Sequence, residues 1–245
     1  MNGFPVWRSA AIVLVQGSNA AEFLQGYLTC ATERLADDAL TPMAICNVKG
    51  RVIASGWAFH WAAEEAVALV VHESLADTIS QFLSPYARFS RCNLVAADAQ
   101  LRLLDNTLPA PSDKQVLQTS GPALAEHHFV VDSSQGAEDA DDCSALLDAG
   151  LVDASYAFIS EASSAEYLPQ MLGLDKAGAV DFDKGCYLGQ EIVARAQFRG
   201  AVKKQLVQFA AEADADPVIG QAYADHIKVV SYAAQSGCGL AVSAL

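Results

Sequence analysis

Residues 184–191, Lys-Gly-Cys-Tyr-Leu-Gly-Gln-Glu, carry the densest group of chemically capable side chains in the chain. Residues 190–198 contain neither Gly nor Pro and have helix-forming composition, which predicts a helix there. Cys186 would then lie at or near the N-terminus of that helix and close to Lys184. Both a helix dipole and a neighbouring cation stabilise a thiolate, so Cys186 is the best candidate for a functional cysteine.

The alternative is a tight loop shaped by the two glycines of this segment, in which Cys186 packs as a small apolar residue. The segment taken alone does not choose between these two readings.

Charge points to an anionic ligand or partner near the same segment. The chain of 245 residues has a net charge of −14, from 15 basic and 29 acidic residues. This balance argues against broad nucleic-acid binding, which needs clustered positive charge. Five basic residues nevertheless surround the segment: Lys184, Arg195, Arg199, Lys203 and Lys204. Such a basic island in an acidic protein favours an anionic ligand or partner there.

The cysteines indicate a reducing environment. The six are Cys30, Cys46, Cys92, Cys143, Cys186 and Cys238. They form no Cys-x-x-Cys pair, and no His stands at metal-ligand spacing, which disfavours a metal site within the chain.

The longest apolar runs are too short to cross a bilayer, and residues 1–5 lack the layout of a signal peptide. We therefore expect a cytoplasmic protein without a membrane segment.

The order of elements predicts an α+β fold. With 52% hydrophobic and 18% charged residues, the chain has the composition of a compact globular protein of one to three domains. Apolar patterning predicts strands at residues 10–15, 43–46, 51–60 and 66–71, and helices at residues 19–28 and 74–83. Asn19 and Glu22 resemble a capping box for the first helix. This order favours an antiparallel sheet with helices packed against it.

The second half of the chain predicts a change of architecture. Residues 104–112 are expected to form a loop and residues 132–142 an acidic exposed connector. A helix broken by Pro169 is expected at residues 161–172. Short strands follow, at residues 206–210, 227–232 and 240–242. The last forty or so residues therefore favour a small all-β module.

Residues 184–191 resemble the Lys-Gly-Cys-Tyr-x-Gly-Gln-Glu motif of the YgfZ family of folate-binding proteins. These proteins are relatives of the aminomethyltransferase, or T-protein, of the glycine cleavage system. The resemblance covers most of the chain, with weak cover from about residue 95 to 150. Further matching segments are residues 17–29 with Phe23-Leu24-Gln25-Gly26, the Lys-Gly-Arg turn at 46–51, and residues 86–91, 166–171 and 191–204.

The resemblance implies a three-domain ring, with two α+β domains and a small C-terminal β-barrel-like module around a folate cavity. Residues 1–45 together with about 145–200 would form a discontinuous folate-binding domain. Residues 46–144 would form the second α+β domain, and residues 201–245 the short β module.

For the reacting groups, the resemblance implies Cys186 as a low-pKa thiol facing the folate cavity. Lys184, the other candidate catalytic residue, would lower the pKa of that thiol or contact a folate carboxylate. A solvated surface lysine is the alternative for Lys184.

For the cofactor, the resemblance implies tetrahydrofolate or a derivative. Asp153 occupies the position that holds the pterin ring, a task that suits a carboxylate because it accepts paired N–H donors. Arg199 is a candidate for the glutamate tail, and Gln190 and Glu191 match the motif directly. Tyr187 is either a stacking partner of the pterin or a packing aromatic.

Glu191 and Arg195 stand four residues apart and favour an ordinary helix ion pair.

The sequence also bears on catalysis. The catalytic aspartate of the T-protein would fall in residues 70–79, where Ile79 takes its position and Asp77 stands two residues away. The unmatched aspartate argues against aminomethyl transfer and leaves open whether the protein is an enzyme.

The resemblance implies a folate-binding accessory protein that supports iron–sulfur enzymes or assembly proteins, and tRNA modification, through Cys186. A folate-dependent aminomethyltransferase or demethylase is one alternative. The other is a non-catalytic scaffold with structural folate, whose basic island docks an acidic partner.

Overall fold

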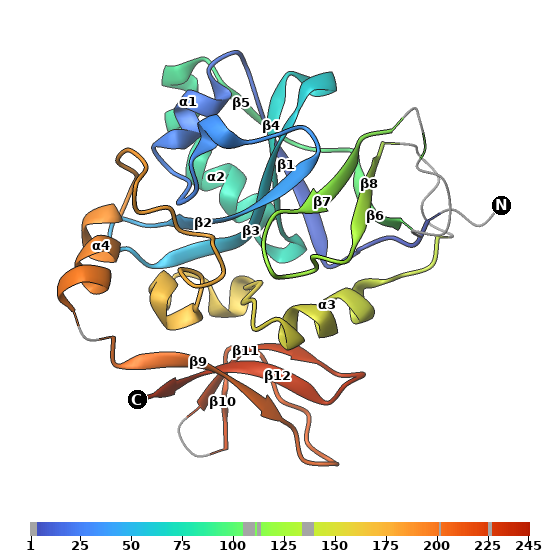
Figure 1. Ribbon diagram of the computed structural model, residues 1–245, viewed down its shortest axis with the longest axis vertical. Coiled ribbons are helices and arrows are strands. Elements are labelled where there is room, and N and C mark those ends of the chain that lie inside the picture. The colour runs from blue at the N-terminus through green and yellow to red at the C-terminus, as the bar shows by residue number, and fades with distance from the viewer. Residues whose placement is uncertain (1–3, 105–110, 112–113, 134–139, 201, 225–226) are drawn as a thin grey trace.

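Two sheets make up the framework of the computed structural model, which describes residues 4–104, 111, 114–133, 140–200, 202–224 and 227–245. The larger sheet has eight strands in the order β5-β1-β4-β3-β2-β7-β8-β6 and the smaller has four in the order β10-β11-β12-β9. Figure 1 shows helix α3 (Ser144–Asp153) and the segment that follows it lying between the two sheets. The architecture is therefore mixed α+β, as the sequence predicted.

Antiparallel pairs build one half of the large sheet. Strand β1 (Ala10–Gln16) pairs with β4 (Ala66–His72) and with β5 (Asn93–Ala96). Strands β2 (Ala39–Cys46) and β3 (Val52–Trp61) form a hairpin, and β3 also pairs with β4. The first six residues of β4 are all buried, so both of its faces are covered and its pattern is a continuous apolar run.

A short parallel pairing joins the second half of the large sheet to the first. Strand β2 pairs with β7 (Val116–Thr119) through two residue pairs, and β7 then pairs with β8 (His128–Asp132) and β8 with β6 (Gln100–Leu104). The sheet curls around a core that includes Trp7, Trp57 and Tyr156. The rings of Trp57 and Tyr156 stack at 4.8 Å between centroids, and buried aromatics of this size dominate core energetics.

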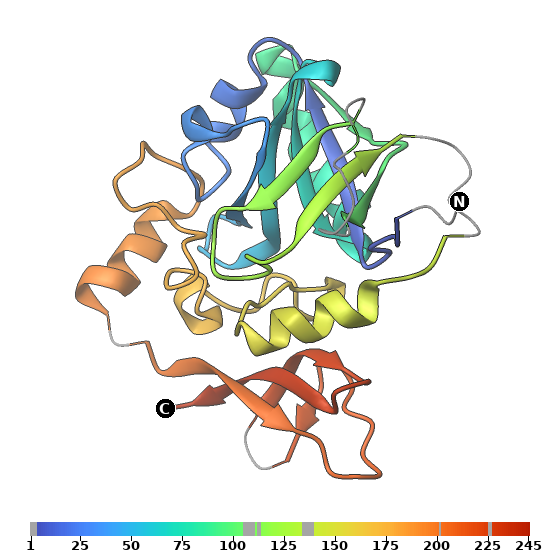
Figure 2. The same ribbon diagram turned by 45° about the vertical axis from the view of Figure 1, so that its right-hand side comes forward.

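The C-terminal sheet stands apart from the large one (Figure 2). Its strands are β9 (Lys204–Ala210), β10 (Ala222–Tyr223), β11 (Ile227–Ala233) and β12 (Cys238–Ala244). It packs on α3 through an apolar cluster that includes Val152, Ala233 and Leu240. The amide of Gln208 adds a hydrogen bond, donating to the Val152 carbonyl at 2.7 Å.

The predicted elements are confirmed in most positions. The helices expected at residues 19–28 and 74–83 are α1 (Ala20–Gln25) and α2 (Ala76–Ala87). Asn19 precedes α1 but makes no side-chain capping hydrogen bond, so the capping-box prediction was wrong. The predicted broken helix at 161–172 was also wrong: two short 3₁₀ turns, Glu161–Ser163 and Pro169–Leu172, lie there.

Other predictions concern segments that lie partly outside the described residues. The expected loop at 104–112 and the acidic connector at 132–142 both include such residues. The predicted domain boundary near residue 45 falls at the end of β2, inside the β2–β3 hairpin, so hydrogen bonding continues across it. Residues 201–245 contain the separate four-stranded sheet. The three-domain division stays a prediction.

Within the described residues, each helix is too short or too polar to span a lipid bilayer.

Candidate functional site

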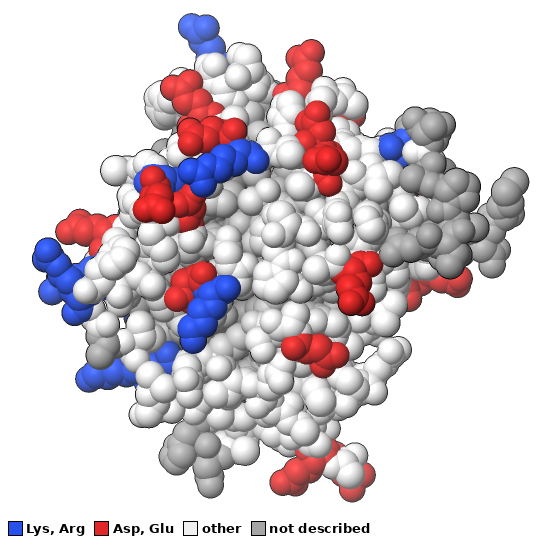
Figure 3. Space-filling model, viewed as in Figure 1, with Lys and Arg blue, Asp and Glu red and all other residues white. Residues whose placement is uncertain are grey.

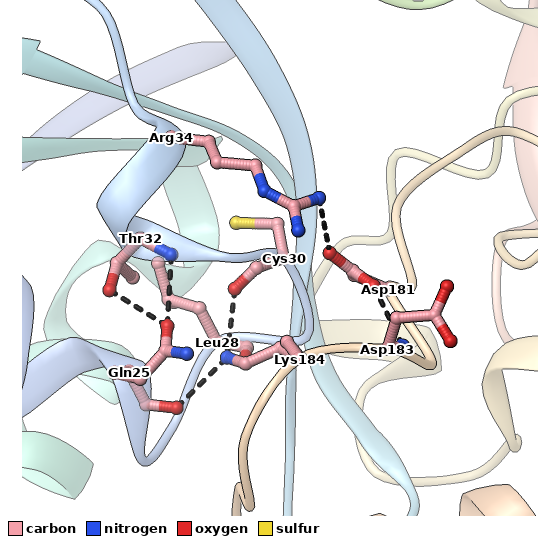
Figure 4. A network of polar contacts seen from close by, with 8 residues as sticks. All are labelled: Gln25, Leu28, Cys30, Thr32, Arg34, Asp181, Asp183 and Lys184. Carbon is pink, nitrogen blue, oxygen red and sulfur yellow. Dashed lines mark hydrogen bonds and ion pairs between the residues drawn. The ribbon is translucent and has the colours of Figure 1, made fainter.

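A buried lysine fixes the start of the cysteine-containing segment. The Nζ atom of Lys184 donates hydrogen bonds to the carbonyl oxygens of Gln25 at 2.9 Å, Leu28 at 2.6 Å and Cys30 at 2.8 Å (Figure 4). Three carbonyls match the three N–H donors of an ammonium group. Lys184 is only 8% exposed, and burial lowers its pKa to about 8. Lys184 therefore holds the segment that follows residue 183 against the turn after α1.

Neighbouring polar contacts strengthen the contact between these two segments. Arg34 pairs with Asp181 at 3.1 Å, and the side-chain oxygen of Gln25 accepts from the backbone N–H of Thr32 at 2.9 Å (Figure 4). The hydroxyl of Thr32 donates either to that oxygen, at 2.9 Å, or to the Ala21 carbonyl, at 2.7 Å. These contacts hold residues 25–34 against residues 181–184.

Cys186 is exposed, and its surroundings differ from those expected. Helix α4 (Gln190–Arg199) begins four residues after Cys186, whereas the effect of a helix dipole is confined to the first turn. The ammonium of Lys184 is directed at backbone carbonyls, and no hydrogen bond joins it to Cys186 within the described part of the chain. Cys186 thus lies near the start of a helix, as expected, but outside its first turn, and the solvated alternative for Lys184 was wrong.

The turn after β2 forms the second wall of the site. The side chain of Asn47 accepts from the backbone N–H groups of Lys49 at 2.9 Å and Arg51 at 3.1 Å, which shapes the turn. Gly189 lies directly against it with φ +81°, and a Cβ atom there would meet the Asn47 carbonyl oxygen at 2.3 Å. Gly189 is therefore required both for its left-handed backbone and for the close approach.

Three segments that are distant in sequence meet at this point. The backbone N–H of Leu188 donates to the carbonyl of Gly26 at 2.9 Å, which joins the cysteine segment to the end of α1. In Figure 1 the loop before α4 extends toward α1. We call the surface formed by residues 25–26, 47–50 and 184–189 the motif surface. Each of its three parts comes from a segment singled out in the sequence, and Cys186 lies exposed on it.

Tyr187 and Gln190 support the loop from within. Tyr187 is buried, and its ring centroid lies 5.3 Å from the Nζ atom of Lys184. Burial raises the pKa of its hydroxyl, so Tyr187 stays neutral at physiological pH. The backbone N–H of Tyr187 donates to the side-chain oxygen of Gln190 at 3.4 Å. Of the two alternatives for Tyr187, this geometry is that of a packing aromatic.

Val193 is the one buried residue of helix α4, all of whose residues are described. Glu191, Arg195 and Arg199 are all exposed, and within the described residues no ion pair joins Glu191 to Arg195. The expected helix ion pair is therefore wrong. In Figure 3 most basic side chains lie on the side of the molecule where Figure 1 places α4 and the start of β9.

Asp153 lies apart from the motif surface. It is the last residue of α3 and is exposed, and its backbone carbonyl accepts from the amide of Gln208 at 3.2 Å. No described hydrogen bond or ion pair connects Asp153 with Cys186 or Lys184. The structure thus holds Cys186, Lys184, Tyr187 and Gln190 together and places Asp153 elsewhere.

A depression of about 240 Å³ lies at the two residues that follow Asp153 in the chain. Its lining includes Ala154 and Ser155, which directly follow Asp153, together with Gln170, Lys176, Gln205 and Leu206. The side-chain oxygen of Gln170 is buried and has no hydrogen-bond partner among the described residues, while its amide donates to the Val193 carbonyl of α4 at 2.9 Å. Gln170 thus connects this depression to α4. It falls within the matched segment 166–171, a signal that could have identified it.

A second cavity, of about 50 Å³, lies between α3 and the C-terminal sheet. His72, Asp148 and Tyr232 are among its lining residues. Asp148 already accepts hydrogen bonds from the Ser9 hydroxyl at 2.8 Å and the Trp7 indole at 3.3 Å. Drug-sized ligands occupy pockets of roughly 300–1,000 Å³, so this cavity is suited to water rather than to a large ligand.

The position that corresponds to the catalytic aspartate of the T-protein, taken here by Ile79, lies in the core. Ile79 is fully buried in α2, and Asp77 is exposed in the first turn of that helix. Neither residue lines the two cavities beside α3.

Comparison with known proteins places this geometry in a family. No family model matches the chain. The tRNA-modifying protein YgfZ of Pectobacterium carotovorum subsp. carotovorum is 31% identical over 238 residues, which cover 86% of this chain and 71% of that protein. This chain belongs to the YgfZ family. The YgfZ protein of Sodalis glossinidius is 29% identical over 237 residues, covering 86% of this chain and 72% of that protein.

A solved structure extends the likeness to the fold. The glycine cleavage system aminomethyltransferase T from Bartonella henselae matches with a TM-score of 0.60 at 12% identity, covering 99% of this chain and 78% of that one. At this identity the likeness concerns the fold alone. The resemblance read from residues 184–191 and the α+β fold class are both confirmed. For a YgfZ-family chain, the motif surface is where three of the sequence segments that resemble the family meet.

Proposed function

We propose that this YgfZ-family chain is a tetrahydrofolate-binding accessory protein that supports iron–sulfur enzymes, including those that modify tRNA. Cys186 is its reacting group. The observation that carries this proposal is the meeting of three sequence segments around one exposed thiol. The names of the relatives support the link to tRNA modification, and the family resemblance supports folate and the iron–sulfur enzymes.

The two candidate catalytic residues have different tasks in this proposal. Cys186 is accessible and can reach a partner molecule or a small reactant. Lys184 is a positioning residue, because its three donors are occupied by carbonyls that hold the loop in place. Tyr187 and Gln190 give that loop a packed base.

The depression of about 240 Å³ that follows Asp153 in the chain suits the pterin ring of a folate, with the rest of the ligand outside it. The unpaired oxygen of Gln170 and the carboxylate of Asp153 can accept N–H groups of a pterin ring. Leu206 offers apolar surface, and Lys176 can pair with a glutamate carboxylate. Arg199 and Glu191, exposed on α4, are proposed contacts for the outer part of the ligand. Bound tetrahydrofolate would supply the capacity to carry a one-carbon group.

Calorimetric titration with tetrahydrofolate tests the cofactor. We expect the wild type to bind and Asp153→Ala to weaken binding about tenfold, as for the loss of a charge-assisted hydrogen bond of about 1.4 kcal/mol. Asp77→Ala removes another exposed helical carboxylate and should leave the affinity unchanged. Absence of binding by the wild type would refute the folate proposal. Equal affinities of wild type and Asp153→Ala would refute only the role of Asp153.

Complementation tests the cysteine. In cells lacking the native copy, Cys186→Ala should fail to restore iron–sulfur enzyme activities. Cys238→Ala, which alters a half-buried cysteine of the C-terminal sheet, should restore them. Full restoration by Cys186→Ala would contradict a reacting role for this thiol.

The exposed face of α4 favours one other function, a scaffold that docks an acidic partner. Ile192 and Phe198 are 39% and 70% exposed, and Arg195 and Arg199 are exposed beside them. Aromatic and arginine side chains of this kind often anchor protein interfaces. Under this reading, Arg199→Glu combined with Lys203→Glu abolishes function in cells, whereas Cys186→Ala does not.

A further inference from the structure

An aromatic depression lies beside α1. Its volume is about 460 Å³, and its lining includes Phe23, Tyr27, Tyr86 and Phe89. The rings of Phe23 and Tyr27 lie 5.0 Å apart between centroids, and those of Tyr27 and Tyr86 lie 5.6 Å apart. Phe89 is 90% exposed and Tyr86 48% exposed. The rings of Phe23, Tyr27 and Tyr86 are therefore connected, and together with the exposed ring of Phe89 at the same depression we call them the aromatic platform.

A second depression adjoins the first across the 3₁₀ turn Arg88–Ser90. Its volume is about 470 Å³, and Arg88 and Arg91 line it together with polar groups that include Asn93. Both arginines are exposed. Two guanidinium groups thus lie next to the aromatic platform, in a chain whose net charge is −14.

The segment that carries these side chains is firmly held. The backbone N–H of Cys92 donates to the Ala87 carbonyl at 2.9 Å, and the amide of Asn19 donates to the Ser90 carbonyl at 3.3 Å. Arg91 adopts a left-handed backbone with φ +58°, which costs energy for a residue with a Cβ atom. A Cβ atom at Gly17 would meet the Arg91 carbonyl oxygen at 2.8 Å, so the two backbones are in close contact. The exposed ring of Phe89 is therefore presented by an ordered turn.

We propose that these two depressions bind a nucleotide, with its base on the aromatic platform and its phosphate beside the two arginines. Stacking on an aromatic ring suits any base, because every base has a π-face. A guanidinium binds phosphate with paired hydrogen bonds. An apolar protein segment could cover Phe89 and Tyr86, but it would leave the adjoining Arg88 and Arg91 without anionic partners. The charge next to the rings therefore favours a nucleotide.

The nucleotide site would border the motif surface. Gly26 lines the aromatic depression, and its carbonyl accepts from the Leu188 N–H of the cysteine loop. This inference goes beyond the proposed function, because none of its residues belongs to the proposed folate site. The same chemistry can come from a free nucleotide or from an unpaired nucleotide of an RNA. A single-nucleotide site is compatible with the acidic charge that argues against a broad nucleic-acid surface.

Calorimetric titrations of the purified full chain with AMP, with adenosine and with the RNA pentanucleotide of adenylates test the site. AMP should bind more tightly than adenosine, because only AMP carries the phosphate. Phe89→Ala should weaken AMP binding about fivefold or more, the loss expected for one base–aromatic stack. Phe198→Ala removes another largely exposed ring, 70% exposed on α4, and is the control.

A double substitution tests the two arginines, and a third arginine serves as the control. Arg88→Gln combined with Arg91→Asn, where Asn tolerates the left-handed backbone, should reduce AMP affinity to that of adenosine. For the pentanucleotide the salt dependence of log K should become shallower by about 0.7 for each phosphate that an arginine no longer neutralises. Arg195→Gln on α4 should change neither value.

The outcomes separate the possible ligands. Tighter binding of the pentanucleotide than of AMP assigns the site to RNA, and equal binding assigns it to a free nucleotide. Failure of both AMP and the pentanucleotide to bind at millimolar concentration would overturn the proposal, as would equal effects of Phe89→Ala and Phe198→Ala. Tetrahydrofolate should not displace AMP, and displacement would refute a separate site.

Discussion

Replacing Lys184 by methionine tests whether the buried ammonium holds the motif surface together. The substitution keeps an unbranched side chain but removes three donors and leaves the carbonyls of Gln25, Leu28 and Cys30 without them. Two of these three hydrogen bonds are fully buried, so water cannot readily replace the ammonium there. The cost should therefore exceed that of removing a surface lysine.

The magnitude follows from opposing contributions. A hydrogen bond to a charged group stabilises by about 1.5–3 kcal/mol, and a buried acceptor left unpaired costs about 1–3 kcal/mol. Against this, the folded state no longer has to desolvate an ammonium, which costs several kcal/mol. We expect Lys184→Met to lower the free energy of unfolding by about 3 kcal/mol, because two buried carbonyls are left without a donor. This is a large part of the roughly 5–15 kcal/mol that stabilises a domain.

Urea unfolding followed by circular dichroism measures this destabilisation, provided that the m-value is the same in both proteins. Lys203→Met, at an exposed position, is the control and should change stability by less than about 0.5 kcal/mol. A second readout is local. Removal of the ammonium should increase hydrogen exchange at the Leu188 N–H, which bonds to Gly26, more than in the core strand β4.

A structural role for the ammonium is refuted if Lys184→Met destabilises the protein by no more than Lys203→Met does. It is also refuted if exchange at Leu188 stays at the wild-type rate, because the loop would then not depend on the ammonium.

Two further predictions concern the same surface. Gly189→Ala should cost at least 1–2 kcal/mol more than Gly178→Ala in urea unfolding. The two glycines have similar φ angles, +81° and +77°, but only at Gly189 would a Cβ atom clash, with the Asn47 carbonyl oxygen; equal costs would show that the close approach does not matter. In thiol labelling at pH 8 in native buffer, Cys186 should react and Cys30 should not, because burial raises the pKa of Cys30 to about 12 and leaves almost no thiolate. Rapid labelling of Cys30 at pH 8 would contradict its burial.

The strands and most helices could be predicted because their patterns are local. Apolar runs such as residues 66–71 show buried strands wherever the chain places them, and β4 lies there. The helix expected at 161–172 failed because Pro169 and the compact packing of this segment favour 3₁₀ turns. The parallel pairing of β2 with β7 joins residues 39–40 to 118–119, and no local pattern encodes such a contact.

By itself, the sequence determined the family motif and the α+β class, and it singled out Cys186 as the candidate reacting thiol. These follow from residue types, spacing and periodicity within short stretches. Only the tertiary structure decided that Lys184 is buried against carbonyls, that Cys186 stands free of the helix start and that Asp153 lies apart from both. The reason is physical: burial and hydrogen-bond partners depend on chain segments more than 150 residues apart, as for Lys184 and Leu28.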